Sequence, residues 1–173
     1  MIDFSQKNKK HLNLLLTGLF ISLIVFNCSE KSSQLSEEPI STSDIMQINQ
    51  INRNYSQGWL ENDSAKVLGL FSDSATIIPS GLMPITGRRS IKEFWFPDDG
   101  SKTLILKYDL EILEIHGSAN LAYSYEHGNL SFTYEKGDFK MQRDSESYAI
   151  TVYKKNNLGN WKIVKRIWSD LKP

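Results

Sequence analysis

The sequence has little cysteine, no excess charge of either sign and few catalytic motifs. It contains one cysteine among 173 residues, which excludes an internal disulfide and a cysteine-rich zinc or iron–sulfur site. Its 20 basic and 20 acidic residues cancel, so the chain lacks the positive charge on which non-specific binding to nucleic acid depends. It has no phosphate-binding glycine loop, HExxH or GxSxG motif. We therefore expect no nucleic-acid partner, no metal and no cofactor.

One long apolar run is present, from Leu12 to Phe26, and it follows three lysines. The run is shorter than the roughly 20 residues of a membrane-spanning helix and is typical of a signal peptide, which we place at residues 1–27. It ends in Val25-Phe26-Asn27-Cys28, which resembles the lipobox of bacterial lipoproteins. The resemblance implies that the chain is cut before Cys28 and that Cys28 is lipidated. The alternative is an uncleaved anchor with an incidental cysteine.

Residues 28–43 form a predicted tether between the lipidated cysteine and the domain. They are rich in Ser and Glu and hold too little apolar surface to fold by themselves. We expect the domain itself over residues 44–173. Ser29 directly after the cysteine matches the lipoprotein sorting pattern for the outer membrane. The protein is therefore expected in the cell envelope, lipid-anchored to a membrane, on either the periplasmic or the surface face.

The first part of the domain has the apolar spacing of helices. From Ile45 to Trp59, apolar residues recur at intervals of three and four, which predicts a helix capped by Ser43 or Asp44. A second helix, a turn, a short strand and a third helix are expected over residues 64–71, 72–74, 75–78 and 88–96.

After Gly100 the sequence becomes rich in β-branched and aromatic residues separated by turns. Four long strands are expected over residues 103–116, 121–134, 145–155 and 161–168. Helices gathered on one face of an antiparallel sheet define an α+β domain. The sequence thus predicts three N-terminal helices packed on a long, twisted and mainly antiparallel sheet.

Two stretches carry a family pattern. The first runs from Asn62-Asp63 through Val67–Thr76 to Gly87–Phe94, and the second is the ending Gly159–Ser169. Together they resemble the nuclear transport factor two superfamily, in its SnoaL-like and ketosteroid-isomerase-like branches, over roughly residues 44–170. The resemblance implies a curved sheet that forms a cone with the helices, a cystatin-like α+β roll, and a homodimer. This fold hosts isomerases, cyclases, hydratases, binding modules and assembly domains, so the function remains open.

The ketosteroid isomerases use three catalytic groups, and the resemblance carries over only one of them. Tyr55 lies eight residues before Asp63 and matches the tyrosine that binds the substrate oxygen. At the position of the catalytic base this chain reads Ile78-Pro79, and Thr151 stands at the position of the second aspartate. Isomerisation by that mechanism is therefore not expected.

The last strand carries two further candidates. Trp168 falls where the isomerases place an aromatic residue against their ligand, and the period of two puts Arg166 on the same face. A guanidinium in an apolar cavity needs a carboxylate partner, which either an internal Asp or Glu or an anionic ligand supplies. The expected ligand pocket consists of Tyr55, Trp59, Trp95, Thr151, Arg166 and Trp168.

The catalytic residues stay unknown, with Tyr55 and His127 as weak candidates. His127 is either a half-exposed strand residue or a general base, which requires an inward orientation and an orienting carboxylate. Three functions remain open. The first is a membrane-tethered module that binds a small, largely apolar molecule with or without a negative charge. The second is a SnoaL-like lyase, cyclase or isomerase of a small carbonyl compound, and the third is a non-catalytic envelope interaction or dimerisation domain with a filled cone.

Overall fold

The computed structural model describes residues 39–171. The predicted signal peptide, Cys28 and most of the tether lie outside the described residues. Within the described range, three helices precede or interrupt six strands, and none of these helices is long and apolar enough to cross a membrane. The elements are α2 (Thr42–Leu60), α3 (Ser64–Gly69), β1 (Phe71–Ile78), β2 (Ile85–Thr86), α4 (Arg88–Trp95), β3 (Lys102–Ser118), β4 (Leu121–Lys136), β5 (Phe139–Lys155) and β6 (Trp161–Asp170).

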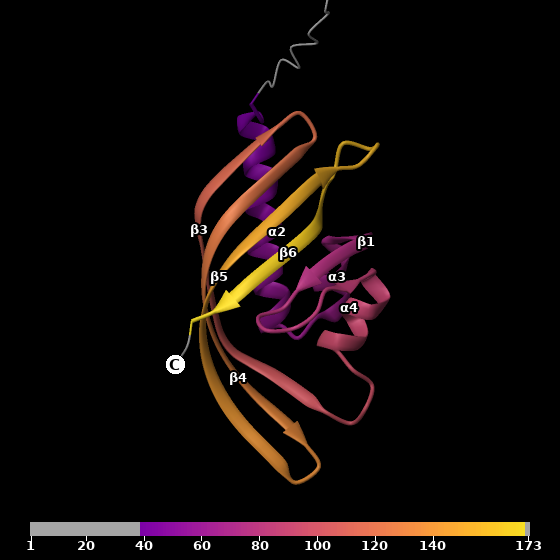
Figure 1. Cartoon of the computed structure of the whole chain (residues 1–173), viewed down its shortest axis with the longest axis vertical. Coiled ribbons are helices and arrows are strands. Elements are labelled where there is room, and N and C mark those ends of the chain that lie inside the picture. Colours follow the sequence, from indigo (N-terminus) through magenta and orange to yellow (C-terminus); the bar gives the residue numbers. More distant parts are fainter. Residues whose placement is uncertain (1–38, 172–173) are drawn as a thin grey trace, which may run out of the picture. The chain divides into compact units, whose positions relative to one another are not determined.

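The six strands form one sheet in the order β2-β1-β6-β5-β4-β3. All neighbouring strands are antiparallel except β1 and β6, which run parallel. The long strands curve around the side on which the helices lie (Figure 1). Register shifts in β3, against β4, and in β6, against β5, accompany this curvature, as expected of β-bulges. The α+β fold class is therefore confirmed, with helices packed on a curved, unclosed and mainly antiparallel sheet.

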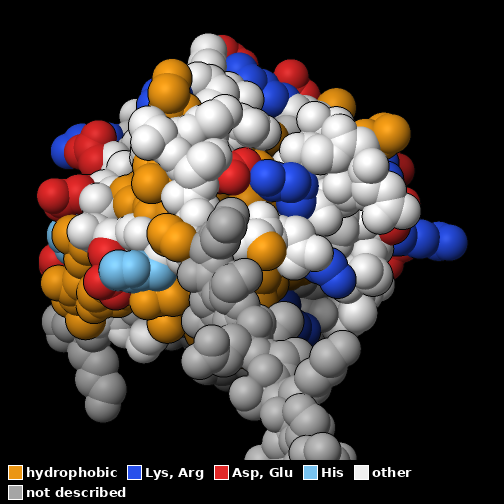
Figure 2. Space-filling view, turned by 90° about the horizontal axis from the view of Figure 1, so that it is seen from above, with side chains coloured by type: hydrophobic (Ala, Val, Ile, Leu, Met, Phe, Trp, Pro, Cys, Tyr) orange, Lys and Arg blue, Asp and Glu red, His pale blue; other side chains and the backbone are white. Residues whose placement is uncertain are grey.

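The two faces of the sheet differ because successive side chains of a strand point to opposite sides. On β4, Ala122, Ser124 and Glu126 point toward the helices and are buried, whereas Tyr123 is exposed and His127 is half-buried. We call the helix-covered side the inner face and the opposite side the outer face. In Figure 2 hydrophobic side chains gather beside a histidine at the surface of the molecule.

Helix α2 begins earlier than predicted and has a different cap. The Ser41 hydroxyl accepts a hydrogen bond from the Asp44 backbone at 3.1 Å, and the Asp44 carboxylate accepts one from the Ser41 backbone at 3.3 Å. This capping box replaces the predicted caps Ser43 and Asp44. Just before it, Ile40 donates to the Gly117 carbonyl at 3.1 Å. The folded part therefore includes residues 39–43, in contrast to the predicted boundary at residue 44.

Two strands extend beyond their predicted limits. β1 includes residues 72–74, which were predicted as a turn and which lie between Phe71, in register with Ile163 of the parallel strand β6, and Thr76, in register with Lys165 after a register shift. β5 begins at Phe139 and not at residue 145, since it pairs with β4 up to Lys136. Residues 139–144 are polar except for Phe139 and Met141, and pairing with β4 outweighs the low β propensity of the polar residues.

The hydrophobic core lies between the helices and the inner face. Trp161 of β6 is 3% exposed, and its indole donates to the Asp44 carboxylate at 2.8 Å. The members of the hydrophobic core are Ile48, Ile51, Tyr55, Val67, Leu68, Phe71, Ala75, Ile77, Ile91, Ala122, Tyr153, Trp161 and Ile163. The core holds α2 along the sheet, which places the C-terminal half of this helix beside the cavity described next.

Candidate functional site: an aromatic cavity over a buried ion pair

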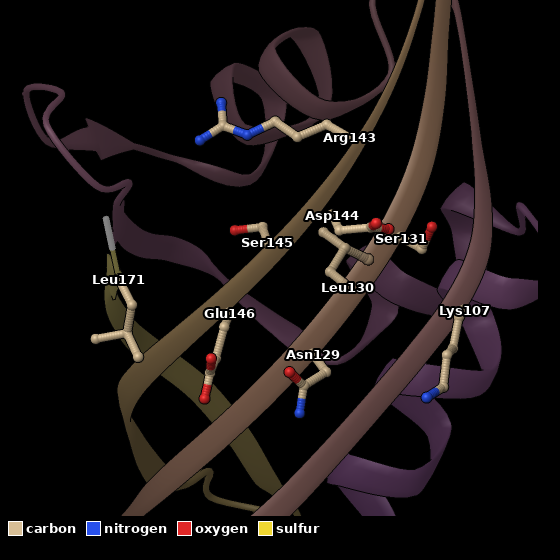
Figure 3. Close-up of a pocket in the computed structure, with 9 residues that line it drawn as sticks. All are labelled: Lys107, Asn129, Leu130, Ser131, Arg143, Asp144, Ser145, Glu146 and Leu171. Atoms are coloured by element: carbon tan, nitrogen blue, oxygen red, sulfur yellow. The ribbon is translucent and has the colours of Figure 1, made fainter. Parts of the chain in front are cut away.

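A polar groove of about 560 Å³ runs along β3, β4 and β5. Figure 3 shows that its side chains do not converge, since Arg143 and Lys107 lie at opposite sides of the view. Over residues 39–171, no three His, Cys, Asp or Glu side chains come together as metal ligands. A set of diverging side chains offers no point at which a ligand could be held, so this groove is not the candidate site.

A second hollow, of about 320 Å³, lies between the helices and the inner face of the sheet. It receives side chains from α2, α4 and the four long strands. Its lining consists of Tyr55, Trp59, Phe94, Trp95, Thr103, Ile105, Tyr108, Leu130, Phe132, Ser145, Ser147, Arg166, Trp168 and Asp170. We call this hollow the aromatic cavity, because seven of these fourteen side chains are Phe, Tyr or Trp.

The walls of the aromatic cavity are built from rings in mutual contact. The Trp59 and Trp95 rings meet edge to face with centroids 5.3 Å apart, and Trp95 lies 6.4 Å from Trp168. Phe96 stacks on Trp59 with ring centroids 4.9 Å apart. Such contacts add to the stability gained from burying the rings, so the walls are held in place without a ligand.

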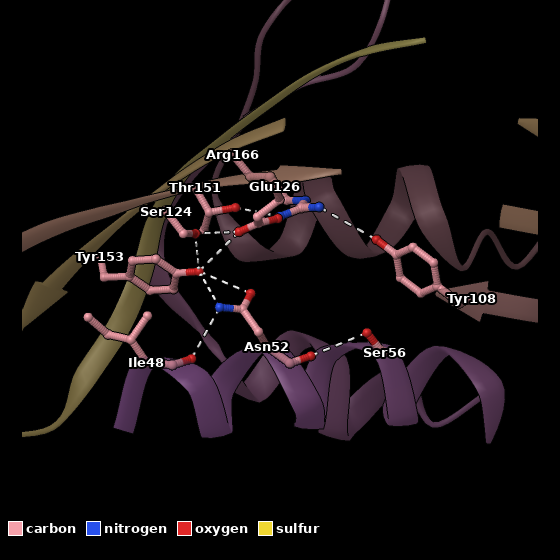
Figure 4. Close-up of polar contacts among 9 residues, drawn as sticks. All are labelled: Ile48, Asn52, Ser56, Tyr108, Ser124, Glu126, Thr151, Tyr153 and Arg166. Carbon is pink, nitrogen blue, oxygen red and sulfur yellow. Dashed lines mark hydrogen bonds and ion pairs between the residues drawn. The ribbon is translucent and has the colours of Figure 1, made fainter. Parts of the chain in front are cut away.

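Arg166 forms the floor of the aromatic cavity. Its side chain is 5% exposed, and its guanidinium carbon lies 4.8 Å from the centroid of the Tyr55 ring. On one side, Nη1 binds the carboxylate of Glu126 and the hydroxyl of Thr151. On the other side, Nη2 lies 3.5 Å from the hydroxyl of Tyr108. The guanidinium thus connects a fully buried carboxylate to a phenol that faces the cavity (Figure 4).

Behind the floor, a buried hydrogen-bond network holds Glu126. Its carboxylate accepts from the Ser124 hydroxyl and lies 3.3 Å from the Tyr153 hydroxyl. The Asn52 amide of α2 donates to the Tyr153 oxygen at 2.9 Å and to the Ile48 carbonyl at 3.2 Å. Buried charges are tolerated when they are paired and hydrogen-bonded, as Glu126 is here. The network therefore joins helix α2 to the cavity floor through β5, β4 and β6 (Figure 4).

Burial and the ion pair also set the protonation states of the tyrosines and the arginine at the cavity floor. Burial raises the pKa of the Tyr55 and Tyr108 phenols, which therefore keep their protons at neutral pH. Burial by itself lowers the pKa of Arg166, but the nearby negative charge of Glu126 raises it well above its usual value. The floor is thus a charged guanidinium flanked by neutral phenols, a set of hydrogen-bond donors.

Five of the predicted pocket residues come together in the aromatic cavity: Tyr55, Trp59, Trp95, Arg166 and Trp168. The sixth, Thr151, is fully buried below Arg166 and is not part of the lining. Its predicted place in the pocket is corrected, because the long Arg166 side chain from the neighbouring strand covers it.

His127 does not contribute to the aromatic cavity. Its Nε2 lies 2.8 Å from a carboxylate oxygen of Glu146, and its ring contacts Tyr148 with centroids 4.9 Å apart. Its neighbour Glu126 points inward, so the period of two turns His127 to the outer face. The orienting carboxylate is present, but the inward orientation that a general base for this cavity requires is not. The prediction of His127 as a candidate base is therefore corrected.

The sequence left two partners open for Arg166, and the structure supplies the internal one. Glu126 pairs with the guanidinium, yet the cone is not filled, because the aromatic cavity remains on the other side of Arg166. An ion pair and a cavity were expected as alternatives, and the structure combines them.

Sequence reasoning missed Tyr108 in the lining and Glu126 as the partner of Arg166. Glu126 alternates with the small residues Ala122 and Ser124 on the buried face of β4. An acidic residue in phase with small buried residues signals a buried ion pair. Tyr108 carries no comparable signal, since a tyrosine in a long strand is equally at home on either face.

The comparisons with known proteins give the fold. No protein-family model and no curated protein sequence matches the chain. Among solved structures, a ketosteroid isomerase-like protein from Erwinia carotovora atroseptica superposes with a TM-score of 0.66 at 15% identity, covering 77% of this chain and all of that one. An NTF2-like protein of unknown function from Pseudomonas putida reaches 0.58 at 18% identity, covering 78% and 99%.

A third similar structure, a protein of unknown function with a cystatin-like fold from Nostoc punctiforme, reaches a TM-score of 0.52 at 12% identity, covering 76% of this chain and 94% of that one. The structural neighbours are thus NTF2-like and ketosteroid-isomerase-like proteins with the cystatin-like fold. At these identities the likeness shows the fold alone, which is consistent with a small-molecule binding or SnoaL-like domain.

Proposed function

We propose that the protein binds a small, largely apolar molecule in the aromatic cavity. The observation that carries the proposal is the cavity itself, because about 320 Å³ with aromatic walls and a few polar groups at one end is typical of ligand sites. A cavity lined by large apolar side chains without a ligand to fill it costs stability, so its presence in a packed domain favours a binding role.

Binding is favoured over catalysis by the groups around the aromatic cavity. Glu126 is covered by Arg166 and committed to the ion pair, and Asp170 is the one carboxylate in the lining. The similar structure from Erwinia is described as ketosteroid isomerase-like, but the alternative of a lyase, cyclase or isomerase relied on His127 as base. His127 faces away from the cavity, so the geometry supports a binding module best.

Ligand binding in the aromatic cavity is tested with a variant whose larger side chain fills the cavity. Ser147 lines it, and Ser147→Phe places an aromatic ring in the space that a ligand would occupy. Three of the four tryptophans line the cavity, so tryptophan fluorescence of the full chain reports binding. With 4-tert-butylcyclohexanone as the probe, we expect saturable binding by the wild type and at least tenfold weaker binding by Ser147→Phe.

The matched control is Ser131→Phe, which introduces the same ring at a position outside this lining. It is expected to bind like the wild type. Equal binding by all three proteins would place the probe elsewhere and overturn the proposal, as would the absence of any binding by the wild type.

We further propose that the domain is tethered to a membrane, in the cell envelope, through a lipid on Cys28. The support is the order of a positive segment, an apolar run and a lipobox-like ending in residues 1–28. In bacterial cells, Cys28→Ser is expected to abolish incorporation of labelled palmitate and to release the protein from the outer-membrane fraction. Unchanged labelling of the variant would contradict the tether.

A second copy of this chain is the partner that we propose for the outer face. Tyr123, Tyr148, Ile150 and Ile167 keep between 36% and 47% of their surface exposed there, and large exposed apolar patches mark interaction sites. We call these four residues the outer patch.

The charges around the outer patch fit a second copy. Glu146 lies beyond Tyr148 on one side of the outer patch, and Lys165 lies opposite Val152 on the other side. A two-fold axis across the strands would bring Glu146 of each copy toward Lys165 of the other, so the face is complementary to itself. Homodimerisation through this face is compatible with ligand binding, because the aromatic cavity opens on the opposite side of the sheet.

A further inference from the structure

We infer that the turn between β5 and β6 docks on an anionic phospholipid surface, with Leu158 inserted among the lipid headgroups and Lys154 and Lys162 facing their phosphates. The inference rests on the proposed lipid tether and identifies the surface of the domain that meets the membrane. It is carried by the position, the exposure and the charge of this turn. We call residues 154–162 the docking turn.

The docking turn lies at the end of the domain where the chain from Cys28 enters. The start of α2, the β3–β4 turn and the docking turn all lie at the top of Figure 1. The Ile40 backbone donates to the Gly117 carbonyl at 3.1 Å, and the Lys155 backbone donates to the Asn120 carbonyl at 2.9 Å. These two hydrogen bonds fasten the entering chain and the docking turn to the same end of β3 and the turn that follows it.

The proposed tether is short, so it keeps this end of the domain near the membrane. Ten residues separate Cys28 from Pro39, and such a chain spans at most about 40 Å when fully extended. A surface tethered this closely meets its partner at an effective concentration of about 1 mM. The docking turn therefore needs only a modest affinity for lipid to stay on the membrane.

Hydrogen bonds fix the docking turn and present Leu158 to solvent. Leu158 is 85% exposed, more than any other large hydrophobic residue within residues 39–171. The Asn156 side chain accepts from the backbone N–H groups of Leu158 and Asn160, both at 3.0 Å. Gly159 closes the turn with a positive φ of 80° and donates to the Asn156 carbonyl at 2.9 Å. Because the backbone is already ordered, little conformational freedom is lost when Leu158 enters lipid.

The docking turn is also basic, with three lysines and no acidic residue. Lys155 pairs with Asp44 at 2.7 Å. Lys154 and Lys162 form no ion pair in the described part of the chain. The Lys162 ammonium donates to the Gly69 carbonyl, which carries no charge to compensate its own. The strand register places Lys154 directly opposite Lys162, where like charges repel each other, so a layer of phosphates fits this surface.

A second leucine lies beside these lysines. Leu121 is 52% exposed and stands opposite Lys154 across β4 and β5. Residues 117–122, which form the neighbouring turn, carry no charged side chain. Figure 2 views the molecule from this end, and both hydrophobic side chains in orange and Lys or Arg side chains in blue lie at its surface. This end of the domain thus combines exposed leucines with uncompensated positive charge.

An anionic phospholipid surface is the partner that satisfies both features. Apolar side chains gain free energy at the boundary between headgroups and acyl chains, while lysines extend their stems over apolar surface and leave their charges at the phosphates. A protein partner is less favoured, because protein interfaces are centred on a broad apolar core, whereas the docking turn offers one leucine at its tip. The proposed homodimer is compatible with docking, because a two-fold axis along the membrane normal makes the two docking turns equivalent.

The test measures whether the tip of the docking turn reaches lipid. Leu158→Cys is purified from bacterial membranes in its lipidated form, labelled with bimane at the new thiol and incorporated into vesicles through its own anchor. The vesicles contain phosphatidylcholine, about 30% phosphatidylglycerol and a lipid with a nitroxide quencher on its acyl chain. Met83→Cys is the matched control, since Met83 is 81% exposed and follows the end of β1 that points away from the docking turn.

We expect about threefold more quenching of the label at position 158 than at position 83. The excess is expected to disappear in vesicles of phosphatidylcholine alone and at about 0.5 M salt. It should also disappear when Lys154→Glu is added to Leu158→Cys. Lys140→Glu, at an exposed lysine near the other end of β5, is the control for charge and should retain the excess.

Equal quenching at the two positions, in protein that is anchored to the vesicles, would overturn the inference and leave the proposed tether intact. Quenching at position 158 that depends neither on the lipid charge nor on Lys154 would also overturn it. Protein that does not incorporate into vesicles at all would overturn the tether and the docking together.

Discussion

Arg166 and Glu126 form a buried ion pair directly below the candidate site. The pair lies under the aromatic cavity, and Thr151, Ser124 and Tyr153 complete its hydrogen bonds. Breaking such a pair by removing one partner is far more costly than replacing both, because the remaining charge stays buried and unpaired. The loss of stability therefore depends on whether one partner is replaced or both are.

Arg166→Met is expected to lower the free energy of unfolding by about 3–5 kcal/mol, because it leaves Glu126 buried without its cation. The double variant Arg166→Met, Glu126→Leu is expected to recover a large part of this loss. Urea unfolding followed by circular dichroism measures both. If the double variant were less stable than Arg166→Met, the pair would not be coupled as described.

Helix α2 is held at its N-terminus by one carboxylate with three kinds of partner. Asp44 completes the capping box with Ser41, accepts from the Trp161 indole at 2.8 Å and pairs with Lys155 at 2.7 Å. It thereby ties the start of the helix to β5 and β6. The hydrogen bond from Lys155 is the main reason why the pKa of Asp44 lies well below its usual value, against the opposing effect of burial.

Because the folded state lowers the pKa of Asp44, its ionised form stabilises the fold. This contribution is complete above the unfolded pKa of about 4 and is lost as the pH falls below that value toward the folded pKa. We expect Asp44→Asn to cost about 2 kcal/mol at pH 7 and to unfold with a weaker pH dependence below pH 4. Parallel acid-unfolding slopes in variant and wild type would contradict this role.

Glu61 provides the matched control for this prediction. Its pKa is also lowered, mainly by a hydrogen bond from Lys66, but the Glu61 side chain is 46% exposed and the Lys66 side chain is 27% exposed. Exposed pairs contribute little to stability, so Glu61→Gln is expected to change the free energy of unfolding much less than Asp44→Asn.

At the scale of the whole molecule, the two faces of the sheet have different roles. The inner face carries the core and the aromatic cavity, whereas the outer patch is left exposed by the described residues. If the outer patch is the homodimer interface that we propose, a charge in its centre should separate the copies without altering the cavity.

Ile150→Lys is therefore expected to convert a dimer of the full chain into a monomer, measured by light scattering coupled to size-exclusion chromatography. Ile150 is 47% exposed and lies opposite Ile167 at the middle of the patch, so the substitution leaves the core intact. Met83→Lys, at an exposed apolar residue outside the patch, is the control and should remain dimeric. A wild-type monomer at micromolar concentration would contradict the proposal.

Much of the fold could be predicted because it depends on local patterns. The spacing of apolar residues predicted helix α2, and the change to β-branched and aromatic residues predicted the four long strands. The limits of β1 and β5 could not be predicted, since residues 72–74 are polar and lie at a register shift of β1 against β6, and residues 139–144, polar except for Phe139 and Met141, become a strand by pairing with β4.

The candidate site could likewise be predicted only in part. The α+β fold, the inward side of Arg166 and Trp168 and the aromatic composition of the cavity could be predicted, because periodicity and local spacing decide which face a side chain occupies. Two contacts of Arg166 could not be predicted: its ion pair with Glu126, 40 residues earlier in the chain, and its contact with the Tyr108 hydroxyl of β3. Those contacts depend on strand register and on the curvature of the sheet, which bring together residues from strands that are distant in the chain.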